Sequence, residues 1–125
     1  MLLNSRLQAL FLLNATVLIT HQIDAAFWHE WELFHIQGGN QINLLLNLPI
    51  IALVLFAQGQ VMANTKVSIA YYKLIAILGF LTAGIHSAFF AVGSEAFIQP
   101  MSIALLIATT ILSSAQLFLV PAPLK

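Results

Sequence analysis

Four long apolar stretches, separated by short polar links, make up most of the chain. They cover residues 7–27, 42–62, 74–92 and 98–120. A helix needs about 20 apolar residues to cross the hydrocarbon core of a bilayer, so each stretch is long enough to span it. Pro49 lies inside the second stretch and should kink it, which membrane helices tolerate, while Pro100 falls in the first turn of the fourth. The pattern therefore predicts four membrane-spanning helices.

The links between these stretches are short and contain turn-forming residues. They lie near residues 38–40, 63–66 and 93–95, and Gly38 and Gly39 are suited to end the first helix in a left-handed cap. Short links make neighbouring helices antiparallel. We therefore expect an all-α fold, an integral membrane up-down-up-down four-helix bundle forming a single domain over residues 1–125. The N-terminal stretch also has features of a cleaved signal peptide, but we expect it to be retained as a span.

The composition supports a lipid environment. The chain has 125 residues, 61% of them hydrophobic and 6% charged, whereas soluble domains carry about 25% charged residues. The net charge is zero and no basic run occurs, so nucleic acid is not an expected partner. Cysteine is absent, which excludes disulfides and thiolate metal sites. The expected partner is the lipid bilayer, and a small bundle of this kind could also form a homo-oligomer or join a larger membrane complex.

Charged residues separate to the two sides of the predicted bundle. The basic residues share one side: Arg6, Lys66, Lys73 and Lys125. The acidic residues lie toward the other: Asp24, Glu30, Glu32 and Glu95. The positive-inside rule then predicts that both termini are cytoplasmic.

Residues 21–35 hold three of the four histidines and three of the four acidic residues. His21 and Asp24 are three positions apart, so their side chains can touch on one helix face. If the first helix continues straight beyond residue 27, Glu32 and His35 repeat this pairing farther out, and Glu30 points nearly opposite.

Polar residues on all four spans fall at similar depths. His21 and His86 each lie about 9 Å inside the outer end of their spans, Asn47 about 8 Å and Ser102 about 6 Å. An ionisable residue inside a span is a functional-site hypothesis by default. We therefore predict a site built on His21, Asp24 and His86 in the outer half of the bilayer.

Other polar residues form a secondary group near this predicted site. Its members are His29, Glu32, His35 and Asn47. His29, Glu32 and His35 lie outside the lipid, where polar residues are common without any function, and Asn47 inside its span could serve only helix packing, so this group is the weaker candidate.

Several kinds of chemistry fit these residue types. Two histidines and a carboxylate can bind zinc or non-haem iron with a coordination position left open. A histidine beside an acid can instead carry a proton, and paired histidines can ligate haem, although only their matched depth supports haem. His29-Glu30 begins like a His-Glu-x-x-His zinc motif, but position 33 is leucine. The sequence leaves open whether the chain is an enzyme. Our leading hypothesis is that the site binds a cation, either a metal ion or a proton, for solute handling or metal-assisted chemistry. The alternative is an accessory or structural subunit of a larger membrane complex, without its own chemistry.

The segment His-Gln-Ile-Asp-Ala-Ala-Phe-Trp-His-Glu-Trp-Glu-Leu-Phe at residues 21–34 resembles the signature of a known group. The pattern H-x-x-D-A-x-x-x-H-E-W-E is similar to that of small bacterial integral membrane proteins of about this length, classed as a domain of unknown function. This resemblance implies four spans and a bacterial inner-membrane location. It implies no activity and identifies no ligand.

Overall fold

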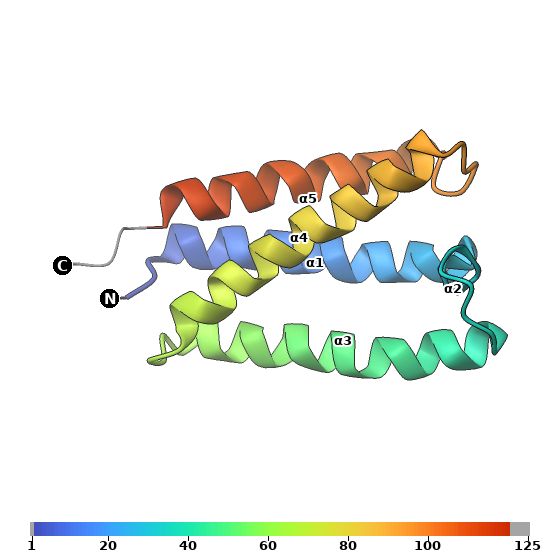
Figure 1. Cartoon of the computed structure of the whole chain (residues 1–125). Coiled ribbons are helices and arrows are strands. Elements are labelled where there is room, and N and C mark those ends of the chain that lie inside the picture. The colour runs from blue at the N-terminus through green and yellow to red at the C-terminus, as the bar shows by residue number, and fades with distance from the viewer. Residues whose placement is uncertain (1, 121–125) are drawn as a thin grey trace.

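The computed structural model describes residues 2–120, which form five helices and no strand. Figure 1 shows four long helices running side by side, with the short α2 at the end away from the start of α1. Their bounds are α1 Ser5–Phe27, α2 Glu30–Leu33, α3 Gly39–Met62, α4 Ser68–Ala91 and α5 Pro100–Leu119. The four long helices are apolar enough to cross a membrane by length and composition. The predicted all-α membrane four-helix bundle is thus confirmed.

The helix ends follow local sequence signals in two cases. Asn4 caps the start of α1, because its side-chain oxygen accepts a 3.0 Å hydrogen bond from the backbone N–H of Leu7. Pro100 opens α5, where its missing N–H costs nothing. Helix α3 continues through Pro49 as one element.

The first helix ends earlier than a straight continuation requires. It stops at Phe27, and His29 then adopts a left-handed backbone conformation with φ of 52°. A non-glycine residue with positive φ is uncommon and is held by its surroundings. Trp28 helps to stabilise this conformation of His29, because its indole N–H donates a 3.2 Å hydrogen bond to the Ser102 hydroxyl on α5. The expected continuation of helix one past residue 27 is therefore wrong, and the glycine pair at 38–39 lies at the start of α3 instead.

The main apolar core occupies the half of the bundle where α1 begins. Phe11 and Tyr72 stack there with ring centroids 6.2 Å apart, and Val54 and Ala57 bring α3 against them. The basic residues Arg6, Lys66 and Lys73 lie at this same end, whereas the predicted fourth one, Lys125, lies outside the described residues. We call this the basic end of the bundle.

A buried polar network, which the sequence analysis missed, joins α1 to α5 within this half. The Asn14 amide donates to Ser113 Oγ at 2.9 Å and to Gln116 Oε1 at 2.6 Å, and it accepts from Thr109 Oγ1 at 2.8 Å. Gln116 also donates to the carbonyl of Tyr72 on α4 at 3.1 Å. Three helices are thereby fixed in one register.

Gly79 allows α4 to approach α5 beside this network. A Cβ built on Gly79 would lie 2.1 Å from Ser113 Oγ and 2.5 Å from Thr109 Oγ1. Both distances are far below van der Waals contact, so only glycine fits without moving the network. Gly79 thus belongs to a close-packing surface, as its spacing from Ala83 and Ser87 indicates.

Candidate metal centre

Two histidines from different helices meet in the half of the bundle far from the basic end. His21 lies near the end of α1 and His86 near the end of α4, and each side chain is only about 2% exposed. Their ring centroids are 4.6 Å apart and the ring planes are perpendicular. The structure therefore brings together the two histidines that lie at matched depth in the sequence.

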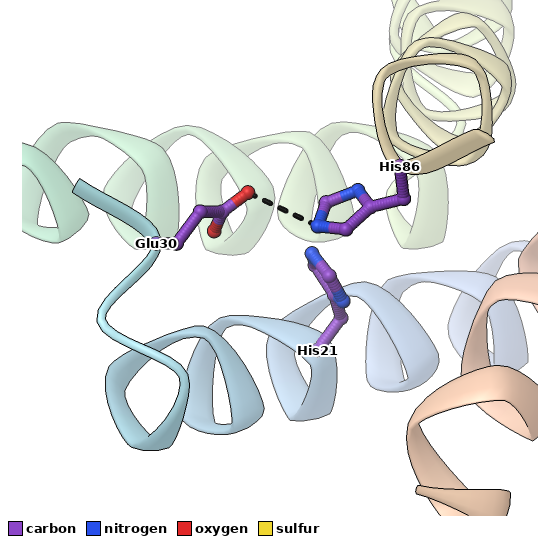
Figure 2. Close-up of side chains that lie close together, drawn as sticks. All are labelled: His21, Glu30 and His86. Atoms are coloured by element: carbon purple, nitrogen blue, oxygen red, sulfur yellow. Dashed lines mark ion pairs between the residues drawn. The ribbon is translucent and has the colours of Figure 1, made fainter. Parts of the chain in front are cut away.

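The third member of the cluster is Glu30, the first residue of α2. Its Oε1 lies 3.3 Å from Nε2 of His86, and one ligand atom from each of His21, Glu30 and His86 falls within 4.8 Å of the others. Figure 2 shows the carboxylate and both rings converging on one point. The straight-helix expectation, which turned Glu30 away from His21, fails because the chain changes direction at His29.

The orientation of His86 is fixed by its own helix. Its Nδ1 lies 2.8 Å from the backbone carbonyl of Thr82, which can only accept, so Nδ1 carries the hydrogen. In the neutral ring Nε2 then presents a lone pair toward Glu30. Such a contact from the second ring nitrogen to a carbonyl is the usual support for a metal-binding histidine.

Two acceptors therefore face each other in this site. Nε2 of His86 is buried and has no hydrogen-bond partner, and its 3.3 Å approach to Glu30 lacks hydrogen-bond alignment. Nδ1 of His21 is likewise buried without a partner. Buried polar atoms are normally satisfied by a hydrogen bond, a water molecule or an ion, so a cation shared by His86 and Glu30 is one way to satisfy this pair.

The spacing of the three side chains suits a small divalent ion. Ligand atoms about 2.0–2.2 Å from zinc in a tetrahedral site lie roughly 3.4 Å from one another. The His86 to Glu30 distance of 3.3 Å already matches this value, and the largest separation in the group, at most 4.8 Å, needs a movement of at most about 1.4 Å.

Phe97 covers the histidine pair from the α4–α5 link. Its ring centroid lies 4.4 Å from that of His86 and 5.4 Å from that of His21, and the residue is 1% exposed. Its backbone has φ of 63°, an unusual conformation for an aromatic residue. Phe97 thus excludes water from one side of the site.

The other side of the site opens into a cavity between α1, α3 and α4. The cavity has a volume of about 320 Å³. His21, Glu30 and His86 line one end of it, and Asn43 and Asn47 of α3 also contribute. Most of the remaining wall is leucine, isoleucine and valine. His21, Glu30 and His86 therefore face a largely apolar space rather than bulk water.

One family comparison covers nearly the whole chain. The family of unknown function DUF6713 matches residues 7–122. The chain belongs to this family. Among curated proteins and solved structures, no match was found. The expected resemblance to small uncharacterised four-span proteins is thus confirmed, and the chemistry of this DUF6713 protein has to be argued from its own side chains.

The other predicted members of the site take different positions in the DUF6713 protein. Asp24 is partly buried one turn beyond His21, and its Oδ2 has no hydrogen-bond partner, but it is not one of the three clustered ligands. Asn47 lines the cavity and donates to Asn43. Ser102 accepts from Trp28 on the far side of Phe97 and does not line the cavity.

The predicted secondary group is not assembled into one site. His29 Nδ1 lies 3.6 Å from Glu32, but both side chains are more than half exposed. His35 is exposed and has φ of 57°. Exposed ion pairs of this kind contribute little to stability. His29, Glu32 and His35 are therefore part of the exposed polar surface at the α2 end of the bundle.

The histidine geometry does not fit a haem. Two axial histidines approach the iron from opposite faces of the porphyrin plane. Here the rings of His21 and His86 are in edge contact at 4.6 Å, which leaves no room between them for a macrocycle.

Proposed function

We propose that His21, Glu30 and His86 bind a divalent transition-metal ion, zinc or ferrous iron, inside the membrane. The observation that carries this proposal is the buried His86 Nε2, which has no hydrogen-bond partner and faces the Glu30 carboxylate at 3.3 Å. Two histidines and one carboxylate form a ligand set used by both metals, with at least one coordination position left open. That position faces the cavity, so a bound metal would act there as a Lewis acid toward a ligand oxygen.

A proton is the competing cation. A single proton between His86 and Glu30 would satisfy those two side chains. It would not involve His21, whereas a metal ion would engage one ligand atom from each of the three residues. The metal therefore accounts for more of the geometry.

The test of metal binding compares two glutamates of the same short helix. Glu30→Gln should weaken Co²⁺ or Zn²⁺ binding about a hundredfold, since a neutral amide replaces the charged ligand. Glu32→Gln should leave it unchanged, because Glu32 is exposed and pairs only with His29. The measurement is a Co²⁺ titration of chelator-stripped protein in detergent, followed by its visible absorption and by Zn²⁺ competition.

Wild-type protein is expected to bind one equivalent of metal. Helical content measured by circular dichroism must match between the two variants, so that unfolding is not mistaken for ligand loss. Equal affinities for Glu30→Gln and Glu32→Gln, or no saturation with the wild type, would overturn the proposed metal centre.

We further propose a bacterial inner-membrane location with both termini in the cytoplasm. The support is that Arg6, Lys66 and Lys73 share the basic end, while the acidic residues lie at the other. In this orientation the metal centre lies in the outer half of the bilayer.

Cysteine accessibility tests this orientation directly. The native chain has no cysteine, so single replacements report without background. In intact cells, Glu32→Cys should react with a membrane-impermeant maleimide and Lys66→Cys should react only after lysis. The reverse pattern would place the metal centre on the cytoplasmic side.

A further inference from the structure

We infer that the cavity beside the metal centre binds a single-chain anionic amphiphile of the fatty-acid type, with its carboxylate on the metal and its chain along α3. This inference rests on the proposed metal centre and names the ligand that occupies its open side. Shape, the placement of polar atoms and charge each support it.

The cavity is long and follows the helices. Its wall on α3 runs from Asn43 to Val54, which is about 16 Å at 1.5 Å per residue. Its wall on α4 runs from Leu78 to His86. A volume of about 320 Å³ is at the small end for ligand sites, so a long and narrow ligand fits better than a bulky one.

Polarity is concentrated toward one end of this cavity, with Thr82 farther along the α4 wall. His21, Glu30 and His86 lie there, and on α3 the polar lining residues Asn43 and Asn47 come before the apolar positions. Toward the basic end the α3 wall continues with residues such as Ile50 and Val54. A ligand with one polar head and an apolar chain matches this distribution.

Charge selects the chemistry of the head. A divalent ion held by two neutral histidines and the Glu30 carboxylate keeps one net positive charge. Burying an unbalanced charge at membrane depth is unfavourable. Asp24 carries a buried, unpartnered oxygen one turn from His21, but it does not line the cavity, so the open coordination position on the cavity side is left for an anion that enters from the cavity. A carboxylate supplies both a negative charge and an oxygen donor, whereas a neutral alcohol supplies only the oxygen donor.

The two tryptophans provide reporters for the test. Trp31 lines the cavity and Trp28 does not. Trp28→Phe therefore leaves a cavity reporter, and Trp31→Phe leaves a reporter outside it. Because both side chains help to place Glu30, the wild type with both tryptophans is measured beside them, and its quenching should show the same saturable component. The probe is stearic acid brominated at two carbons in the carboxyl-proximal half, added to zinc-loaded protein in bilayers of unbrominated lipid.

Quenching of Trp31 should saturate near one probe per protein, whereas quenching of Trp28 should rise without saturating as the probe enters the bilayer. Removing zinc with a chelator, or replacing the acid by the alcohol with the same brominated chain, should weaken the saturable binding at least tenfold. Leu81→Phe, which narrows the cavity, should weaken it similarly. Ile77→Phe should not, because Ile77 is equally exposed on α4 but does not line the cavity.

Separate outcomes distinguish this inference from the metal centre. If calorimetry shows one zinc ion bound but Trp31 quenching does not saturate, the ligand inference is wrong and the metal centre stands. If the saturable quenching is the same with and without zinc, or if the acid and the alcohol bind equally well, then the carboxylate does not bind to the metal. If zinc does not bind at all, both proposals fail.

Discussion

Replacing Asn14 with leucine is expected to lower the free energy of unfolding by roughly 2–5 kcal/mol. The Asn14 amide makes three buried hydrogen bonds to α5, and the leucine leaves Thr109, Ser113 and Gln116 without that partner. Single interhelical hydrogen bonds in membranes contribute about 0.6 kcal/mol on average, with a maximum of about 1.7, so three lost together give this range.

The measurement is reversible unfolding in mixed detergent micelles. Thr16→Ala serves as the control, because the exposed Thr16 hydroxyl bonds only to the carbonyl of Leu12 on its own helix. Gly79→Ala should destabilise the protein through the same network, since its Cβ would displace Ser113 and Thr109. The double variant should then lose less than the sum of the single losses. A loss below about 1 kcal/mol for Asn14→Leu would show that the network does not hold the helices together.

Phe97→Ala is expected to lower stability by about 3–5 kcal/mol and to speed metal loss at least tenfold. The Phe97 ring is buried against His21, His86 and Trp28 and contributes contacts that alanine cannot make. Its removal also admits water to the histidine pair. The first effect is read from unfolding in detergent, and the second from the rate at which a chelator extracts bound Co²⁺.

The control is a phenylalanine that faces the surroundings. Phe118 is 87% exposed near the end of α5, so Phe118→Ala should change neither stability nor extraction rate appreciably. If the chelator removes Co²⁺ from Phe97→Ala as slowly as from Phe118→Ala, then Phe97 does not shield the proposed metal centre.

The meeting of His21 and His86 was predictable, because a helix rises about 1.5 Å per residue and residue counts therefore give depth in the membrane. Counting residues from the ends of the apolar stretches placed His21 and His86 at equal depth, and their rings are in contact. The four spans and their short links were likewise readable, although α4 begins six residues earlier than expected.

The position of Glu30 could not be read in this way. No glycine or proline marks the end of α1 at Phe27, and the break depends on contacts made in space, including Trp28 with Ser102 and the burial of Trp31. Histidine has no strong local preference for the left-handed backbone conformation, so the sequence does not predict this conformation at His29. The carboxylate that faces His86 was therefore assigned to the wrong side of its helix.

The Asn14 network left a signal that could have been found. Thr109, Ser113 and Gln116 follow one another at spacings of four and three, which places them on one face of α5. To pair them with Asn14, one must know how α5 is rotated about its own axis. The sequence does not define that rotation, because an apolar helix that faces lipid on several sides has no single buried face.

The placement of Glu30 on a four-residue helix has a kinetic consequence. His21 and His86 are held by long helices, but α2 has only four residues and lies between two non-helical links. Short segments at an end of a fold open at a small fraction of the global free energy of unfolding. Metal exchange would therefore follow the opening rate of residues 28–38 and not that of the bundle, so a protein that resists unfolding could still load and release its ion quickly.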